Sequence, residues 1–145
     1  MGEVTVSGRV RIVLKDEHGK IKDDETVDNL IVTVGKNHIA DQMSDQGEAA
    51  MSHMAIGTGT TAAAAGDTAL QTELDRNALT STTQSTNTVT YVGDWAAGDG
   101  TGAITEAGIF NAGAAGVMLC RSVFAVKNKA AGDTLTLTWV LTISV

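Results

Sequence analysis

The sequence predicts a mainly β protein, an antiparallel β-sandwich with a jelly-roll-like arrangement and one or two short helices. Three observations lead to this fold class. Segments near both chain ends alternate apolar and polar residues, the middle of the chain is rich in Thr, Val and Ile, and clusters of Gly, Asp and Asn separate these segments. About seven or eight strands are expected, in one domain over residues 1–145, a length that buries a core without a disulfide or a metal.

The first strand is predicted over Val4–Lys15, where every second residue is apolar or glycine. Asp16–Lys20 carries the residues of a hairpin turn, with Gly19 free to adopt positive φ. The acidic stretch Asp23–Glu25 is expected to interrupt the returning chain. A second β run is then predicted over Asn29–Val34, because its Val and Ile content favours a strand.

Two helices are predicted between the strands. Lys36–Met43 is the best helix candidate, with Ile39 and Met43 spaced so that both face the core. A second short helix is predicted over Asp67–Ala78, capped by Asp67 and with Leu70 and Leu74 on one face.

The remaining strands follow from Val-, Ile- and Thr-rich runs separated by small-residue loops. The predicted strands are Met51–Gly57, a Thr-rich segment within Leu79–Val92, Ile104–Asn111, Val117–Val126 and Leu135–Val145. Gly93–Gly102 is predicted to be a loop. The last strand has the clearest alternation in the chain, and we assign Trp139, together with Phe124, to the core.

Composition excludes several classes of protein. One cysteine cannot form an internal disulfide, so a disulfide scaffold is not expected. No apolar run reaches the length of a membrane span, so no membrane partner is expected. A net charge of −7 argues against a nucleic-acid partner, because phosphate binding needs clustered Lys and Arg.

A search for catalytic chemistry yields no site, and we expect no catalytic residues, no cofactor and no metal. Cys120 lies in an alternating strand and is interpreted as a buried thiol. The histidines His18, His38 and His53 lack the short spacings of common metal motifs. A hydrolase would need His38 and His53 to converge with an aspartate pair.

Two loops carry residues that could bind a ligand. Oxygen ligands for a calcium ion could come from Asp94, Asp99, Thr101 and Glu106, although their spacing is not that of an EF-hand. Gly57–Thr60 lacks the Lys of a phosphate-binding loop and is interpreted as a tight turn.

A carbohydrate-binding jelly roll is the alternative from another class of function. It would present Trp95 and Tyr91 beside carboxylates in a shallow pocket, and the low aromatic content of the chain weakens it.

The strand pattern favours assembly with other proteins. Strands run close to both chain ends, the chain contains no proline, and the outward faces are rich in Thr. Exposed edges without proline or charge must be paired, covered or used for binding.

Several segments together resemble small virion structural proteins of tailed bacteriophages. These segments are Asn29–Lys36, Ala55–Gly59, Thr68–Arg76, Gly100–Asn111, Met118–Phe124 and the alternating last strand. Within that class, a chain of this size without a fibre repeat resembles a capsid decoration, or cement, protein. On this resemblance, Thr105–Gly108 and the Gly57–Gly66 loop are interpreted first as features that define the fold, and only second as contacts with a neighbouring subunit.

The resemblance implies a homo-oligomer, dimer or trimer, on the outer surface of the capsid. There it would bridge neighbouring copies of the major capsid protein after synthesis in the bacterial host cytoplasm. The resemblance also leaves open a tail, baseplate or neck component.

Overall fold

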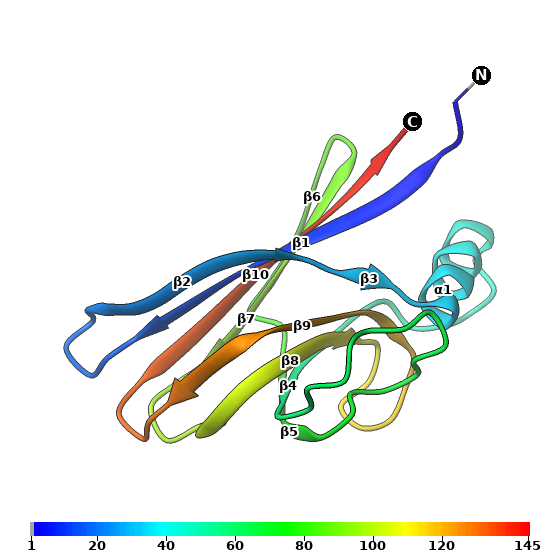
Figure 1. The fold of residues 1–145 in the computed structure, drawn as a ribbon. Helices are drawn as coiled ribbons and strands as arrows, with labels where there is room; N and C mark the ends of the chain where they lie inside the picture. Colours follow the sequence, from blue (N-terminus) through cyan, green and yellow to red (C-terminus); the bar gives the residue numbers. More distant parts are fainter. Residues whose placement is uncertain (1) are drawn as a thin grey trace.

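The computed structural model describes residues 2–145 and shows two five-stranded antiparallel sheets that face each other, which confirms the predicted β-sandwich (Figure 1). Residues 2–145 form ten strands rather than seven or eight, and one helix. Sheet A has the order β2(Ile21–Asp28), β1(Thr5–Lys15), β10(Thr134–Ser144), β7(Thr88–Trp95), β6(Ser81–Ser85). Sheet B has the order β3(Leu30–Ile31), β9(Met118–Lys129), β8(Gly102–Phe110), β4(His53–Gly57), β5(Glu73–Ala78).

The N-terminal hairpin forms as its alternation and turn residues predict. Gly19 has a φ of 80°, and the Asp16 carboxylate accepts the backbone N–H groups of His18 and Lys20, each at 2.9 Å. The predicted interruption at Asp23–Glu25 is wrong, because β2 continues through these residues. The carboxylates of Asp23 and Glu25 reach across to sheet B, where the Lys127 ammonium lies 3.0 Å from one oxygen of each.

The two terminal strands lie in the middle of sheet A, side by side. β1 pairs with β10 along its whole length, with Val10 opposite Trp139. The expectation that the terminal strands leave exposed edges is therefore wrong, since the edges of sheet A are β2 and β6.

The main core lies between the sheets and confirms the sequence assignment of Trp139 and Phe124. Trp139 is fully buried and Phe124 is 8% exposed. The apolar faces of β1 and β10 meet those of β4, β8 and β9 in one cluster that also contains Trp95 and Cys120.

The helix α1(Thr33–Ser44) begins earlier than predicted and takes the last two residues of the predicted strand Asn29–Val34. Only Leu30–Ile31 is extended and paired. Gly35 explains the change, because a Cβ at this position would collide with the Leu119 carbonyl of β9, so glycine lets the first turn pack against the sheet. Met43, predicted to face the core, is 85% exposed.

The predicted helix Asp67–Ala78 is wrong. Residues 67–72 form a loop and Glu73–Ala78 is the edge strand β5, which pairs with β4. Asp67 does not cap a helix, because its carboxylate accepts the Ala64 backbone N–H and an Arg121 N–H instead, both at 2.9 Å. The two leucines predicted to share a face differ in burial, since Leu70 is 8% and Leu74 41% exposed.

The predicted loop Gly93–Gly102 is shorter in the structure. Gly93, Asp94 and Trp95 belong to β7, Gly102 begins β8, and residues 96–101 connect the two strands. Burial of Trp95 in the core extends β7 to this point. Within residues 2–145, α1 is not long and apolar enough to cross a membrane.

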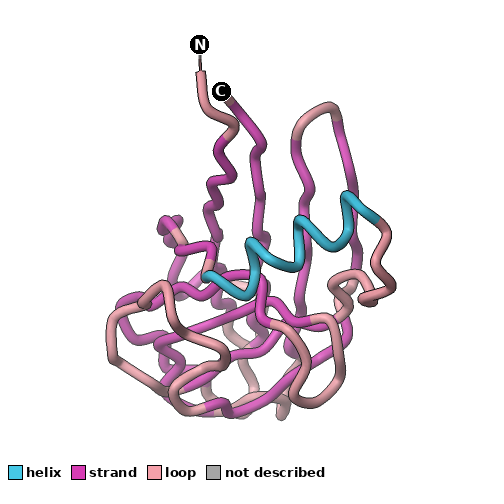
Figure 2. The backbone as a smooth tube through the Cα atoms, turned by 90° about the vertical axis from the view of Figure 1, so that its right-hand side faces the viewer, coloured by secondary structure: helices cyan, strands magenta, loops and turns pink. Residues whose placement is uncertain are grey.

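Sheet A projects beyond sheet B at the end that carries both termini and the β6–β7 hairpin (Figures 1 and 2). Exposure rises along the inward side of β10 where sheet B no longer covers it: Trp139 is 0% exposed, Leu141 5% and Ile143 46%, and Val145, directly after the strand, is 87% exposed. We call this projecting part, the start of β1, the end of β10 and the β6–β7 hairpin, the arm. α1 lies beside the arm (Figure 2).

Candidate functional site

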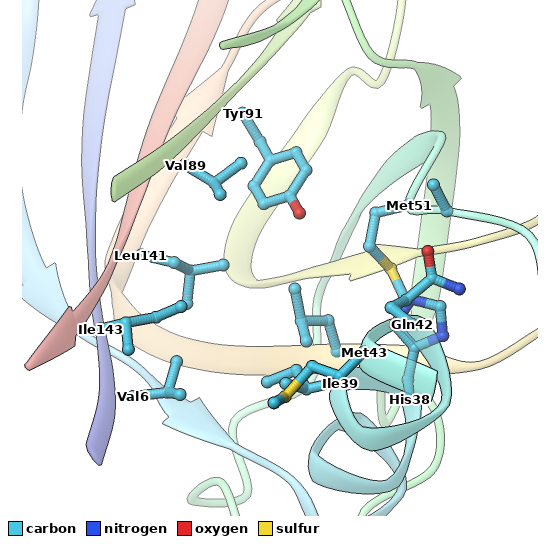
Figure 3. Close-up of a pocket in the computed structure, with 12 residues that line it drawn as sticks. Val6, His38, Ile39, Gln42, Met43, Met51, Val89, Tyr91, Leu141 and Ile143 are labelled. Carbon is cyan, nitrogen blue, oxygen red and sulfur yellow. The ribbon is translucent and has the colours of Figure 1, made fainter. Parts of the chain in front are cut away.

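An apolar groove lies between the arm and α1 and encloses a volume of about 350 Å³ (Figure 3). We call it the arm groove. Sheet A lines one side with Val6, Val89, Tyr91, Leu141 and Ile143. The other side is lined by His38, Ile39, Gln42 and Met43 from α1, Ala50 and Met51 from the following loop, and Leu119 from β9.

The lining of the arm groove combines buried and exposed apolar side chains. Met51, Leu119 and Leu141 are buried, whereas Met43 is 85% and Ile143 46% exposed, and the exposed Val4 and Val145 continue along the arm. Exposed apolar clusters of this kind mark sites of protein–protein contact more often than sites of chemistry.

Polar groups at the edge of the arm groove are held by neighbours within the chain. His38 is 4% exposed and its Nδ1 lies 3.0 Å from a Glu48 carboxylate oxygen. Burial raises the pKa of the Tyr91 hydroxyl. These groups give the groove a few hydrogen-bonding positions around an apolar floor, an arrangement that fits an apolar segment of a partner protein.

Sequence reasoning missed the arm groove, although part of its signal was present. The alternation of β10 continues through Ile143 and Val145, and a periodic pattern alone does not show that sheet B ends before them. The helical face that carries Ile39 and Met43 was predicted to face the core, whereas both residues line the arm groove.

A buried carboxylate organises the opposite side of sheet B. Glu106 is fully buried in β8. One oxygen accepts the backbone N–H groups of Gly59 at 2.7 Å and Thr72 at 2.8 Å. The other accepts the backbone N–H of Gln71 at 2.9 Å and the side-chain Nε–H of Arg121 at 3.1 Å. The carboxylate therefore supplies the acceptors for backbone groups that no strand pairs.

Arg121 extends this network into the loop over residues 58–72. Its remaining guanidinium nitrogens donate to the Asp67 carboxylate and to the Thr61 carbonyl, each at 2.9 Å. A Cβ at Gly59 would collide with Glu106. Thr105–Gly108 and the Gly57–Gly66 loop thus act together to hold the fold.

The four oxygen-bearing residues weighed for calcium do not converge. Asp94 accepts the hydroxyls of Thr80 and Thr136, each at 2.7 Å, while Asp99 accepts an Asn77 amide N–H at 2.7 Å. Glu106 faces Arg121 instead. Within residues 2–145, no group of three or more His, Cys, Asp and Glu side chains is placed to hold a metal ion.

A carboxylate pair lies at one end of the sandwich. Burial and the neighbouring Asp99 raise the pKa of Asp75, and the hydrogen bond from Asn77 lowers the pKa of Asp99. The Lys129 ammonium nearby donates to the Ala96 carbonyl at 2.9 Å, and burial lowers the pKa of this lysine. The carboxylates of Asp99, Asp133 and Asp75 interact electrostatically with this buried lysine.

The single thiol and the histidines lie apart. Cys120 is fully buried, as predicted, and burial raises its pKa, which suppresses the reactive thiolate. His53 Nδ1 lies 2.8 Å from the Ser52 hydroxyl, whereas His38 contacts Glu48 and the side chain of His18 is exposed in the first turn. The His38–His53–Asp convergence weighed for a hydrolase does not form among these contacts.

The pocket expected of a carbohydrate-binding module is also not formed by the residues named for it. Trp95 is fully buried, so it cannot stack on a sugar ring, and Tyr91 belongs to the arm groove. Comparisons with protein-family models, curated proteins and solved structures found no match to this chain.

Proposed function

We propose that this chain is a virion structural protein of the capsid decoration type, which binds the assembled shell through the arm groove. The observation that carries the proposal is the exposed apolar lining of that groove, where Met43 is 85% and Ile143 46% exposed. The bacteriophage context comes from the segments that resemble small virion structural proteins.

The partner that fits the arm groove is an apolar segment of the major capsid protein. The groove lining contains no Lys, Arg, Asp or Glu, so a neutral segment enters without desolvating an unpaired charge. The acidic residues of β2 lie at the other edge of sheet A, away from this surface.

Mass action supplies the mechanism. A subunit that binds only the assembled shell stabilises it by about 2.7 kcal/mol per site when its free concentration is a hundred times the Kd. Binding of several sites by one oligomer increases the effect through avidity. No chemical step is required.

The test uses shells that lack the protein and two matched isoleucine variants. Ile143 lines the arm groove at 46% exposure, and Ile21 lies on β2 at 50% exposure, outside it. We expect wild type and Ile21→Asp to bind expanded shells at a fixed stoichiometry and to raise their melting temperature. Ile143→Asp should bind at least tenfold more weakly.

Two results would contradict the proposal. Equal binding by Ile143→Asp and wild type would exclude the arm groove as the docking surface. Binding to tails but not to shells would exclude the decoration role and favour a tail, baseplate or neck component.

A further inference from the structure

The four sheet edges of the sandwich differ in how they are protected. The edge strand β2 contains Lys22, Asp23, Asp24, Glu25 and Asp28, and β5 contains Glu73, Asp75 and Arg76. The third edge, β3, is two residues long. Charges and short length are the usual devices that prevent an edge from pairing with another chain.

The fourth edge, β6, has none of these devices. Its five residues are all exposed, uncharged and free of proline, and β6 pairs with β7 alone. No charged residue occurs from Ala78 through Gly93, a segment that contains the whole β6–β7 hairpin. In a chain with net charge −7, this hairpin is a place where two copies approach without bringing like charges together.

The register of the hairpin shows which backbone groups face outward. β6 and β7 are joined by the two-residue turn 86–87, so the closing pair Ser85↔Thr88 is hydrogen-bonded and the pairs alternate from there. The N–H and C=O groups of residues 81, 83 and 85 are thus directed to β7. Those of Thr82 and Gln84 are directed to the free edge.

We propose that β6 pairs antiparallel with β6 of a second copy of this chain, with a two-fold axis through Thr83. In this register Thr82 lies opposite Gln84 of the second copy, and each such pair exchanges two backbone hydrogen bonds, four in all. Thr83 faces the partner's Thr83 as a non-hydrogen-bonded pair, with Cα atoms about 4.5 Å apart, where threonine side chains pack well.

This dimer places both arm grooves on the same side of one continuous ten-stranded sheet. The two-fold axis of an antiparallel strand pair is perpendicular to the sheet, so the groove side of one copy joins the groove side of the other. Thr82 and Gln84 share that side with Tyr91 and Val89, their cross-strand neighbours on β7. The β6 dimer specifies how copies of the chain associate in the proposed function. Docking through both grooves at once rests on that proposed function.

The first experiment measures the mass of the free protein in solution, without shells. Sedimentation velocity across the micromolar range should give a species of twice the 14.9 kDa chain mass for wild type. Thr83→Lys places two ammonium groups on the two-fold axis and should give a monomer. Thr26→Lys introduces the same charge at the exposed opposite edge, β2, and should remain a dimer.

The second experiment tests the register by disulfide formation. Thr83→Cys should form an intermolecular disulfide on mild oxidation, because the native thiol Cys120 is buried and the new thiols face each other. Ser85→Cys is the matched control, since the two copies of residue 85 lie about 13 Å apart in this register and cannot be bridged.

The outcomes separate this inference from the proposed function. A wild-type monomer throughout, a trimer, a dimeric Thr83→Lys, or equal cross-linking of the two cysteine variants would overturn the β6 dimer. If the dimer is found and Ile143→Asp still binds shells normally, the edge pairing stands and the docking proposal falls.

Discussion

Glu106→Gln is the substitution that tests most sharply how the fold is held. The side chain keeps its size, but one carboxylate oxygen becomes an NH₂ group. Each oxygen of Glu106 faces two N–H donors, Gly59 and Thr72 on one side and Gln71 and Arg121 on the other. In either orientation of the new amide, its NH₂ group faces two donors and both hydrogen bonds are lost.

The expected cost follows from the charge as well as from the hydrogen bonds. Glu106 is 0% exposed and Arg121 2% exposed, and removing one member of a buried ion pair costs about 3–5 kcal/mol. For a domain of this length that corresponds to a melting temperature lower by on the order of 10 °C. Urea denaturation followed by tryptophan fluorescence measures it, because Trp95 and Trp139 are both buried and report on unfolding.

Asp67→Asn is the graded control. The Asp67 side chain is 26% exposed and contacts the same arginine from the solvent side, so its loss should cost less than half as much as Glu106→Gln. An unfolding free energy for Glu106→Gln within about 1 kcal/mol of wild type would refute the assignment of Glu106 as the residue that holds the 58–72 loop.

Three further predictions concern the core and its ends. Trp139→Ala should lower the unfolding free energy by about 3–5 kcal/mol, and unchanged urea stability would argue against its buried position. Cys120 should react with a thiol reagent only in denaturant, since burial raises its pKa; fast reaction of the native protein would contradict this. Because burial and Asp99 raise the folded-state pKa of Asp75, its stabilising contribution is present below the ordinary aspartate pKa and lost as pH rises through the folded value. Asp75→Asn should therefore melt higher than wild type at pH 7, with the difference narrowing in acid, and a pH-independent difference would contradict the reasoning.

The fold class was predictable because alternation is a local property. Residues 4–15 and 135–145 each show which side faces the core, and they form β1 and β10. Local pattern failed where a distant residue decides the structure. Gly35 lets α1 pack on the Leu119 carbonyl, and nothing within residues 29–34 signals this contact.

The second failed element has the same cause. Residues 67–78 carry leucines at helical spacing. The backbone N–H groups of Gln71 and Thr72 nevertheless bind Glu106, and β5 pairs with β4. The arm groove was missed because it depends on the relative lengths of the two sheets. Strand lengths can be estimated from sequence, but the point at which one sheet stops covering the other is set by tertiary packing.

The location of this chain on the virus particle tests most directly the proposal that it decorates a capsid. Immunogold labelling of intact virions that contain the chain, with an antibody against the β1–β2 hairpin, leaves the arm groove unmasked and reports position alone. We expect gold distributed over the head surface. Gold confined to the tail would contradict the decoration role.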